Sequence, residues 1–142
     1  MSRDVIELAH RFFDAYNRRD LEAFRTLLHQ DGRIVPMFSS VEGKHYVGHD
    51  GVRRWFEDIS LTFRDTRIEI VRAEEHGDWV LLDCLVTAHG LASGAEIRQP
   101  FAIAGHFRGD QADFSASLAT TEDARRAIEN GDETLRAAGL SE

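Results

Sequence analysis

Apolar residues near the start of the chain follow the spacing of an α-helix. They recur every three to four positions, at Val5, Leu8, Phe12 and Tyr16. This spacing places them on one helix face. Asp4 is a candidate N-cap, and Glu7 follows three residues later, as in a capping box. After a break at 17–20, Asp20 is placed to cap a second helix, whose apolar face comprises Leu21, Phe24, Leu27 and Leu28.

Two short apolar segments separate these helices from a third. They span 33–38 and 44–47, and the first contains Pro36. Because proline lacks a backbone N–H, this segment is expected to form an edge strand or a bulge. The sequence GHDG at 48–51 then precedes a third predicted helix, whose apolar face comprises Val52, Trp55, Phe56 and Ile59.

Alternation of apolar and polar residues replaces the helical spacing in the second half of the chain. It predicts four strands, separated by turn-like segments, at 66–73, 79–89, 96–108 and 111–119. Short turns between successive strands indicate an antiparallel meander. Thr120 and Asp123 form a predicted capping pair for a last helix, and the segment after Asn130 is expected to be a frayed helix.

This order of elements predicts an α+β protein. Helices followed by a run of strands pack together on one face of the sheet, and a strongly curved sheet encloses a cavity beneath them. Small-molecule sites lie in such concave surfaces. The length predicts a single domain over residues 1–142, large enough to hold a cavity beside its core.

The charge of the chain narrows the classes of partner. Seventeen Lys and Arg against 25 Asp and Glu give a formal net charge of −8, which disfavours nucleic acid and anionic membrane surfaces. The longest apolar stretch, 79–82, is too short to span a membrane, and the first residues lack a secretion signal. With a single cysteine, Cys84, no internal disulfide forms, and we expect a cytoplasmic protein.

Four stretches of the sequence resemble the SnoaL-like branch of the nuclear transport factor 2-like superfamily. They are FFDAYNRRDLEAFRTLL at 12–28, YVGHDGVRRWFEDI at 46–59, ASGAEIRQPFA at 92–102 and DARRAIENGDETLRAAGL at 123–140. The resemblance implies a cone-shaped α+β barrel, in which three N-terminal helices cover the concave face of a curved antiparallel sheet and a C-terminal helix follows. This branch includes polyketide cyclases, and relatives form homodimers through the outer sheet face. The superfamily also hosts isomerases, dehydratases, epoxide hydrolases and non-catalytic binders, so the fold does not define the activity.

Ketosteroid isomerase relatives imply three catalytic positions that can be compared with this sequence. Their pocket tyrosine falls at Phe12, their general-base aspartate near Pro36 and their protonated aspartate at Gly105. None of these three side chains can donate or transfer a proton. The comparison therefore argues against steroid-type isomerisation by that mechanism.

An apolar pocket lining is the main binding feature that the resemblance implies. The expected ligand-binding side chains are Phe12, Met37, Trp55, Ile59, Phe101 and Phe107, with His49 flanking the cavity mouth. The alternative is that these side chains only pack the core. Tyr16 is a candidate catalytic residue, because a buried phenol usually has a polar partner and its hydroxyl could hydrogen-bond a substrate carbonyl.

The last predicted strand has one polar and one apolar face. Asp113, Ser115 and Ser117 alternate with Phe114, Ala116 and Leu118. The alternation alone favours a buried apolar face and a solvated polar face. The resemblance implies the reverse, with the polar residues facing the cavity and the apolar residues facing a dimer partner. Both registers stay open, and the second makes Ser115 and Ser117 ligand-binding residues and Asp113 a candidate catalytic residue, whose pKa burial would raise.

Motifs for metals and cofactors are missing from the sequence. The seven histidines are not paired with one another or with carboxylates at metal-binding spacings. Nucleophile-elbow, phosphate-loop and dinucleotide fingerprints are also missing. We therefore expect neither a metal nor a cofactor.

Three functions fit these observations. The first is a cofactor-free cyclase, isomerase or hydratase that uses acid–base catalysis on an apolar polyketide-, terpenoid- or steroid-like substrate. The second is a non-catalytic protein that binds a small apolar molecule in the same cavity. The third is a dimeric scaffold, which predicts a filled cavity and no ligand.

Overall fold

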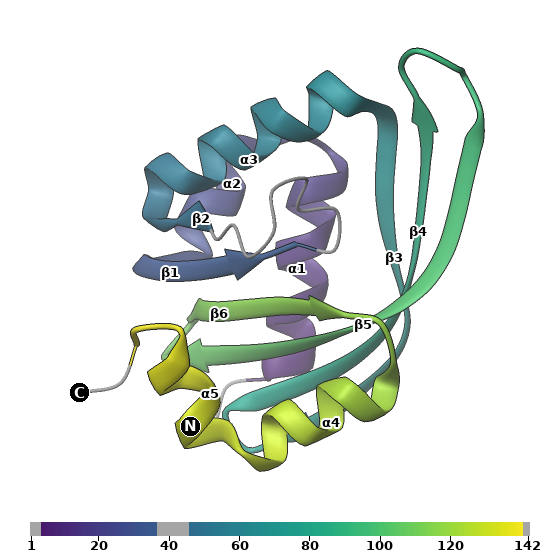
Figure 1. Cartoon of the computed structure of the whole chain (residues 1–142). Coiled ribbons are helices and arrows are strands. Elements are labelled where there is room, and N and C mark those ends of the chain that lie inside the picture. The colour runs from purple at the N-terminus through teal and green to yellow at the C-terminus, as the bar shows by residue number, and fades with distance from the viewer. Residues whose placement is uncertain (1–3, 37–45, 141–142) are drawn as a thin grey trace.

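The computed structural model describes residues 4–36 and 46–140, which form five helices and six strands (Figure 1). In chain order these are α1 (Val5–Asn17), α2 (Leu21–Thr26), β1 (Leu28–Val35), β2 (Tyr46–Val47), α3 (Gly48–Thr62), β3 (Phe63–His76), β4 (Trp79–Gly90), β5 (Glu96–Arg108), β6 (Gln111–Leu118), α4 (Thr121–Glu129) and α5 (Gly131–Ala137). No helix among the described residues is both long and apolar enough to cross a membrane. This architecture confirms the predicted α+β class.

The six strands form one curved sheet in the order β2-β1-β6-β5-β4-β3. Strands β3 to β6 form the predicted antiparallel meander. The sheet as a whole is mixed, because β1 pairs with β6 in parallel. Parallel neighbours need a long connection between them, and here that connection includes α3 and the meander. The expectation of an entirely antiparallel sheet was therefore wrong at this one pairing.

Helices cover both faces of the sheet. In Figure 1, α1, α2 and α3 lie against the concave side, here called the inner face, whereas α4 and α5 lie on the opposite side, the outer face. Successive side chains of β4 alternate between two hydrophobic cores, one on each face of the sheet. Val80 and Leu82 belong to the inner core, and Trp79 and Leu81 belong to the outer core. Phe114 also belongs to the outer core, beneath α4.

The predicted helix caps are present. The carboxylate of Asp4 accepts hydrogen bonds from the backbone N–H groups of Ile6 and Glu7, each over 3.1 Å. Asp20 accepts from Ala23 over 3.1 Å, and Thr120 from Asp123 over 3.0 Å. Each cap pairs a backbone donor that the first helical turn leaves unsatisfied.

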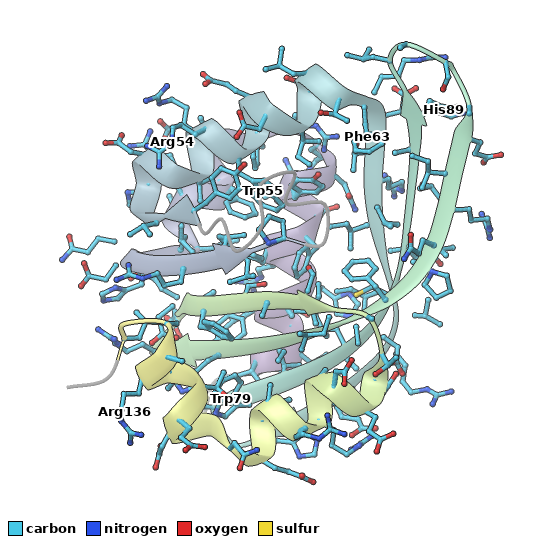
Figure 2. All side chains as sticks on the ribbon, viewed as in Figure 1. Arg54, Trp55, Phe63, Trp79, His89 and Arg136 are labelled. Carbon is cyan, nitrogen blue, oxygen red and sulfur yellow. The ribbon has the colours of Figure 1, made fainter. Side chains whose placement is uncertain are left out.

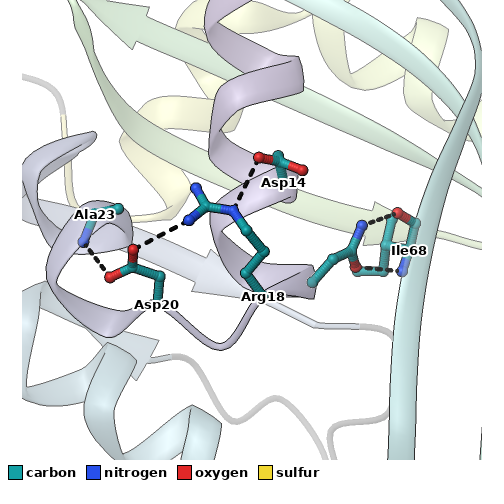
Figure 3. A network of polar contacts seen from close by, with 6 residues as sticks. Asp14, Arg18, Asp20, Ala23 and Ile68 are labelled. Carbon is teal, nitrogen blue, oxygen red and sulfur yellow. Dashed lines mark hydrogen bonds and ion pairs between the residues drawn. The ribbon is translucent and has the colours of Figure 1, made fainter.

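A polar network fixes the end of α1 (Figure 3). Arg18 contacts Asp14 at 3.0 Å and Asp20 at 3.2 Å. Asn17 makes two 2.8 Å hydrogen bonds to the backbone of Ile68, donating to its carbonyl and accepting from its N–H. These bonds tie α1 to β3.

Two element boundaries differ from the sequence predictions. Leu28, expected on the second helix, is the first residue of β1 and pairs with Ala112 of β6. The helix ends at Thr26, whose hydroxyl donates to the carbonyl of Ala23. The expected frayed segment after Asn130 forms the short helix α5, whose Leu135 packs against the outer core.

Candidate functional site

A small pocket lies on the inner face, between the end of α1, the middle of α3 and the sheet. Its volume is about 30 Å³, room for about one water molecule. It is lined by Tyr16, Pro36, Trp55, Ile59, Thr66, Ile68, Val86, Phe101 and Ser117. We call these residues the inner pocket. Figure 2 labels Trp55 on α3, above the sheet.

Two polar atoms of the inner pocket are buried without a partner. Nε1 of Trp55 and Oγ1 of Thr66 make no hydrogen bond within the part of the chain that the structure describes. Such atoms are uncommon, because an unpaired buried donor costs about 1–3 kcal/mol. Both residues line the same cavity, so one bound molecule that reached the two atoms would satisfy them together.

Tyr16 lines the same pocket as Trp55 and Thr66. Its ring stacks on Trp55 at a centroid distance of 4.9 Å and an interplanar angle of 20°. Burial raises the pKa of its phenol to about 12, although the charge of Arg19 acts in the opposite direction. Tyr16 is therefore a hydrogen-bond donor at neutral pH and not a base.

Arg19 holds Tyr16 and Thr66 in place. Its backbone has a φ of 57°, in the left-handed region that few non-glycine residues adopt. Its guanidinium donates to the carbonyl of Tyr16 and to the carbonyl of Thr66, each over 2.7 Å, and lies 4.6 Å from the centroid of the Tyr16 ring. One side chain thus links the end of α1 to the start of β3.

A second inner cavity lies nearer the other end of the sheet. Its volume is about 10 Å³, and its lining includes Phe12, Phe107 and Ser115. Phe12 packs edge-to-face against Phe13, with ring centroids 5.1 Å apart. This space is too small for a ligand, so in this structure these three residues act as core.

The structure divides the predicted ligand-binding residues into groups. Trp55, Ile59, Phe101 and Ser117 line the inner pocket together with Tyr16. His49 is outside both cavities, and its Nε2 donates to the carbonyl of Leu28 over 3.0 Å. Met37 lies outside the described residues.

The family resemblance implied that Asp113 shares a face of β6 with Ser115 and Ser117. In the structure it lies on the opposite face. Along β6, Phe114 pairs with His106 whereas Ala112 pairs with Phe107, so Asp113 is one extra residue in the strand. Such a β-bulge puts two consecutive side chains on one face. Asp113 accordingly contacts His106 at 2.6 Å and Arg108 at 3.3 Å on the outer face. The expectation that its carboxylate enters the cavity was wrong for this reason.

Thr66 is a polar pocket residue that sequence reasoning missed, together with the apolar Pro36 and Ile68. A usable signal exists, because alternation from Ile68 places Thr66 on the same inner face. A threonine at the start of a predicted strand is nevertheless common, and its lack of a partner emerges only from the packing of α1 and α3. Among the described residues, no three His, Cys, Asp or Glu side chains gather where they could hold a metal ion.

Solved structures with this fold are numerous. A hypothetical protein from Catenulispora acidiphila with a ketosteroid isomerase-like fold, in complex with trimethylamine, is 19% identical with a TM-score of 0.71, covering 79% of this chain and 84% of that one. TerC, co-crystallised with polyporic acid, is 20% identical with a TM-score of 0.72, covering 87% and 97%. A protein from Shewanella denitrificans, provisionally named a SnoaL-like polyketide cyclase, is 12% identical with a TM-score of 0.70, covering 90% and 99%.

Sequence comparison gives a more specific result than these structural likenesses, which show the fold alone. None of the curated proteins matches the chain. The SnoaL-like domain, in contrast, matches residues 9–113, which include most of α1, every inner-pocket residue except Ser117, and five of the six strands in full. The chain therefore belongs to the SnoaL-like domain family.

Proposed function

We propose that the chain binds a small, mostly apolar molecule in the inner pocket, through a ligand oxygen that faces Trp55 and Thr66. The observation that supports this most directly is the pair of unpaired buried atoms, Trp55 Nε1 and Thr66 Oγ1, which belong to two residues that line one cavity. An indole N–H can only donate, so the ligand presents an acceptor there, such as a carbonyl or ether oxygen. The hydroxyl of Thr66 can donate to the same group or accept from a neighbouring one.

The remaining lining determines the rest of the ligand. Ile59, Ile68, Val86 and Phe101 offer only apolar surface. A ligand that buries apolar carbon against them gains about 25 cal/mol for each Å² removed from water. Because the free pocket holds only about 30 Å³, a larger polyketide- or terpenoid-like molecule requires lining side chains to move apart. Two of the fold neighbours carry small molecules, trimethylamine in one and polyporic acid in the other.

Catalysis of a cofactor-free cyclisation or isomerisation is the second candidate. The described lining of the inner pocket contains no carboxylate or imidazole, so it offers no base. Tyr16 and Trp55 are instead two donors that could stabilise an enolate oxygen by hydrogen bonding. The provisional naming of a fold neighbour as a polyketide cyclase favours this candidate.

A thermal-shift screen with matched variants tests the binding proposal. The ligand panel comprises polycyclic ketones, polyketide-like aromatics, terpenoids and fatty acids. A ligand at 100 times its Kd adds about 2.7 kcal/mol to stability, a rise in Tm of roughly 5–10 °C for a domain of this size. We expect Thr66→Val and Tyr16→Phe to reduce the shift. Tyr46→Phe is the control, because its hydroxyl contacts Asp58 and does not line the pocket.

The outcomes of the screen separate the candidates. A shift that Thr66→Val reduces and Tyr46→Phe leaves unchanged supports the proposed site. Turnover of the same ligand, lost in Tyr16→Phe, establishes the catalytic candidate. The absence of a shift in every ligand class contradicts the proposal and favours the dimeric scaffold.

A further inference from the structure

A larger and more polar cleft lies on the outer face of the sheet, opposite the inner pocket. It has a volume of about 720 Å³ and is lined by residues of β1, β5, β6, α5 and the segment after it. This volume is within the usual range of small-molecule sites. Figure 2 labels Arg136 of α5 at this side of the molecule, below the sheet. We call this space the outer cleft.

A buried Asp–His pair forms the floor of the outer cleft. Asp113 is 2% exposed and accepts a 2.6 Å hydrogen bond from Nδ1 of His106. The Nε atom of Arg108 lies 3.3 Å from its other oxygen. A carboxylate can only accept, so the hydrogen of the His106 ring is on Nδ1, and Nε2 of a neutral ring is left as an acceptor.

The second ring nitrogen of His106 is available to a ligand. Nε2 has no hydrogen-bond partner among the described residues, and it is not one of their buried unpaired atoms. It therefore reaches solvent, and since His106 lines the outer cleft, it does so there. The bulge at Asp113 produces this orientation, because it turns the carboxylate to the side of the sheet where His106 lies.

The walls of the outer cleft carry unpaired charges of both signs. The guanidinium of Arg136 makes no ion pair or hydrogen bond within the described part of the chain, and neither do the carboxylates of Asp132 and Asp31. A simple anion would meet the carboxylates of Asp31 and Asp132 in this cleft, and a simple cation would meet the guanidinium groups of Arg108 and Arg136. A molecule with both charges can pair with groups of each sign in the lining.

We propose that the outer cleft binds a small zwitterion with a free amine and a free carboxylate, of the amino acid or short peptide class. The ligand carboxylate accepts from Arg136, a pairing that guanidinium geometry favours. The ammonium group donates to Asp31 or Asp132 and to Nε2 of His106. Leu135 and Leu140, which also line the outer cleft, contact an apolar side chain of the ligand. This binding is independent of the function proposed for the inner pocket.

Titration with one dipeptide and two blocked derivatives tests the proposal. The probes are leucyl-glycine, its N-acetyl derivative without the amine and its C-terminal amide without the carboxylate. Binding is measured by calorimetry and by ¹⁵N chemical shifts of the imidazole of His106. We expect the free dipeptide to bind about tenfold or more tightly than either derivative, since each lost charged contact is worth about one factor of ten. Equal binding of all three probes, or no binding at millimolar concentrations, overturns the proposal.

Substitution of charged residues that line the outer cleft tests whether the dipeptide binds there. Arg136→Gln is expected to weaken the binding of leucyl-glycine until it binds no more tightly than its amide. Asp132→Asn is expected to reduce the difference in affinity between leucyl-glycine and its N-acetyl derivative. Both side chains are exposed, so these variants are expected to keep the Tm of the parent. Arg11→Gln is the control, since it changes the charge equally on an exposed face of α1. Binding that Arg11→Gln weakens as much as Arg136→Gln contradicts this site, and so does binding that Thr66→Val abolishes.

Discussion

Nδ1 of His106 donates a 2.6 Å hydrogen bond to Oδ1 of Asp113, at the bulge where the pairing register of β5 and β6 shifts. Both side chains are largely buried, with Asp113 only 2% exposed. The pair therefore stabilises the bulged strand as well as shaping the outer cleft.

Removal of the Asp113 carboxylate is expected to destabilise the protein. In Asp113→Ala the buried N–H of His106 loses its acceptor, and we expect a loss of about 2–3 kcal/mol in the free energy of unfolding. Asp113→Asn keeps an acceptor oxygen and should lose less. Urea unfolding measures both, with Asp110→Ala in the neighbouring exposed turn as the control. An Asp113→Ala protein as stable as its parent would show that the pair contributes nothing to folding.

Removal of the Thr66 hydroxyl, in contrast, is not expected to destabilise the protein. Because Oγ1 is buried without a partner, Thr66→Val should leave the free energy of unfolding unchanged or raise it by up to about 1 kcal/mol. Thr121→Val provides the contrast, since the hydroxyl of Thr121 donates to Asp83 over 2.5 Å and its loss should be destabilising. Chemical denaturation of the two variants compares them directly. A large loss in Thr66→Val would mean that the hydroxyl has a partner in the free protein.

The link between α1 and β3 depends on Asn17. Its amide satisfies both the N–H and the carbonyl of Ile68, so Asn17→Ala is expected to cost about 1–3 kcal/mol. The amide hydrogen of Ile68 should then exchange faster with solvent, which NMR measures at that one residue. Asp14→Ala, which removes an exposed contact of Arg18 on the same helix, should have a much smaller effect on both measurements. Unchanged exchange at Ile68 in Asn17→Ala would argue against this role.

Alkaline pH is expected to destabilise the folded protein through its buried tyrosines. Burial raises the pKa of Tyr16 from 10.0 to about 12, so the folded state keeps a proton that the unfolded state releases above pH 10. Stability from this group is fully present below pH 10 and falls by about 1.4 kcal/mol for each pH unit between 10 and 12. Burial, and then the hydrogen bond to Asp58, also raise the pKa of Tyr46 to about 12.

Phenolate absorbance at 295 nm checks this pH dependence. The chain has only two tyrosines, so the folded protein should show almost no phenolate at pH 10.5, whereas the urea-unfolded chain should be mostly ionised. In Tyr16→Phe the decline of stability with pH should be shallower. Ionisation of about a quarter of the tyrosine at pH 10 without unfolding would place one phenol in water, against the buried position of both.

Local patterns were sufficient to predict most of the fold. The strand predicted at 96–108 coincides with β5, and the caps at Asp4, Asp20 and Thr120 are present. These features depend on neighbouring residues, which a sequence displays directly. Leu28 was assigned to a helix face because it fits one, and its pairing with Ala112, 84 positions later, decides otherwise. Such tertiary contacts override local propensity.

The candidate site was predicted only in part, for a related reason. Trp55, Ile59, Phe101 and Ser117 were expected at the cavity from the family resemblance, and they line the inner pocket. The face of Asp113 could not be predicted, because a single extra residue reverses the alternation beyond it and no glycine marks the bulge. Only the partners across the strand, His106 and Arg108, reveal its direction. The homodimer stays a prediction.

The position of β6 in the sheet has a consequence for synthesis. β1 and β2 are made early, yet they join the sheet only through β6, the last strand to be made. A nascent chain that has reached Arg108 can form the hairpins of β3, β4 and β5, but β1 still lacks its neighbour. Because long-range pairings form late, the open edges of β1 and β5 are the surfaces that a ribosome-bound chain must keep from mispairing until Leu118 has emerged.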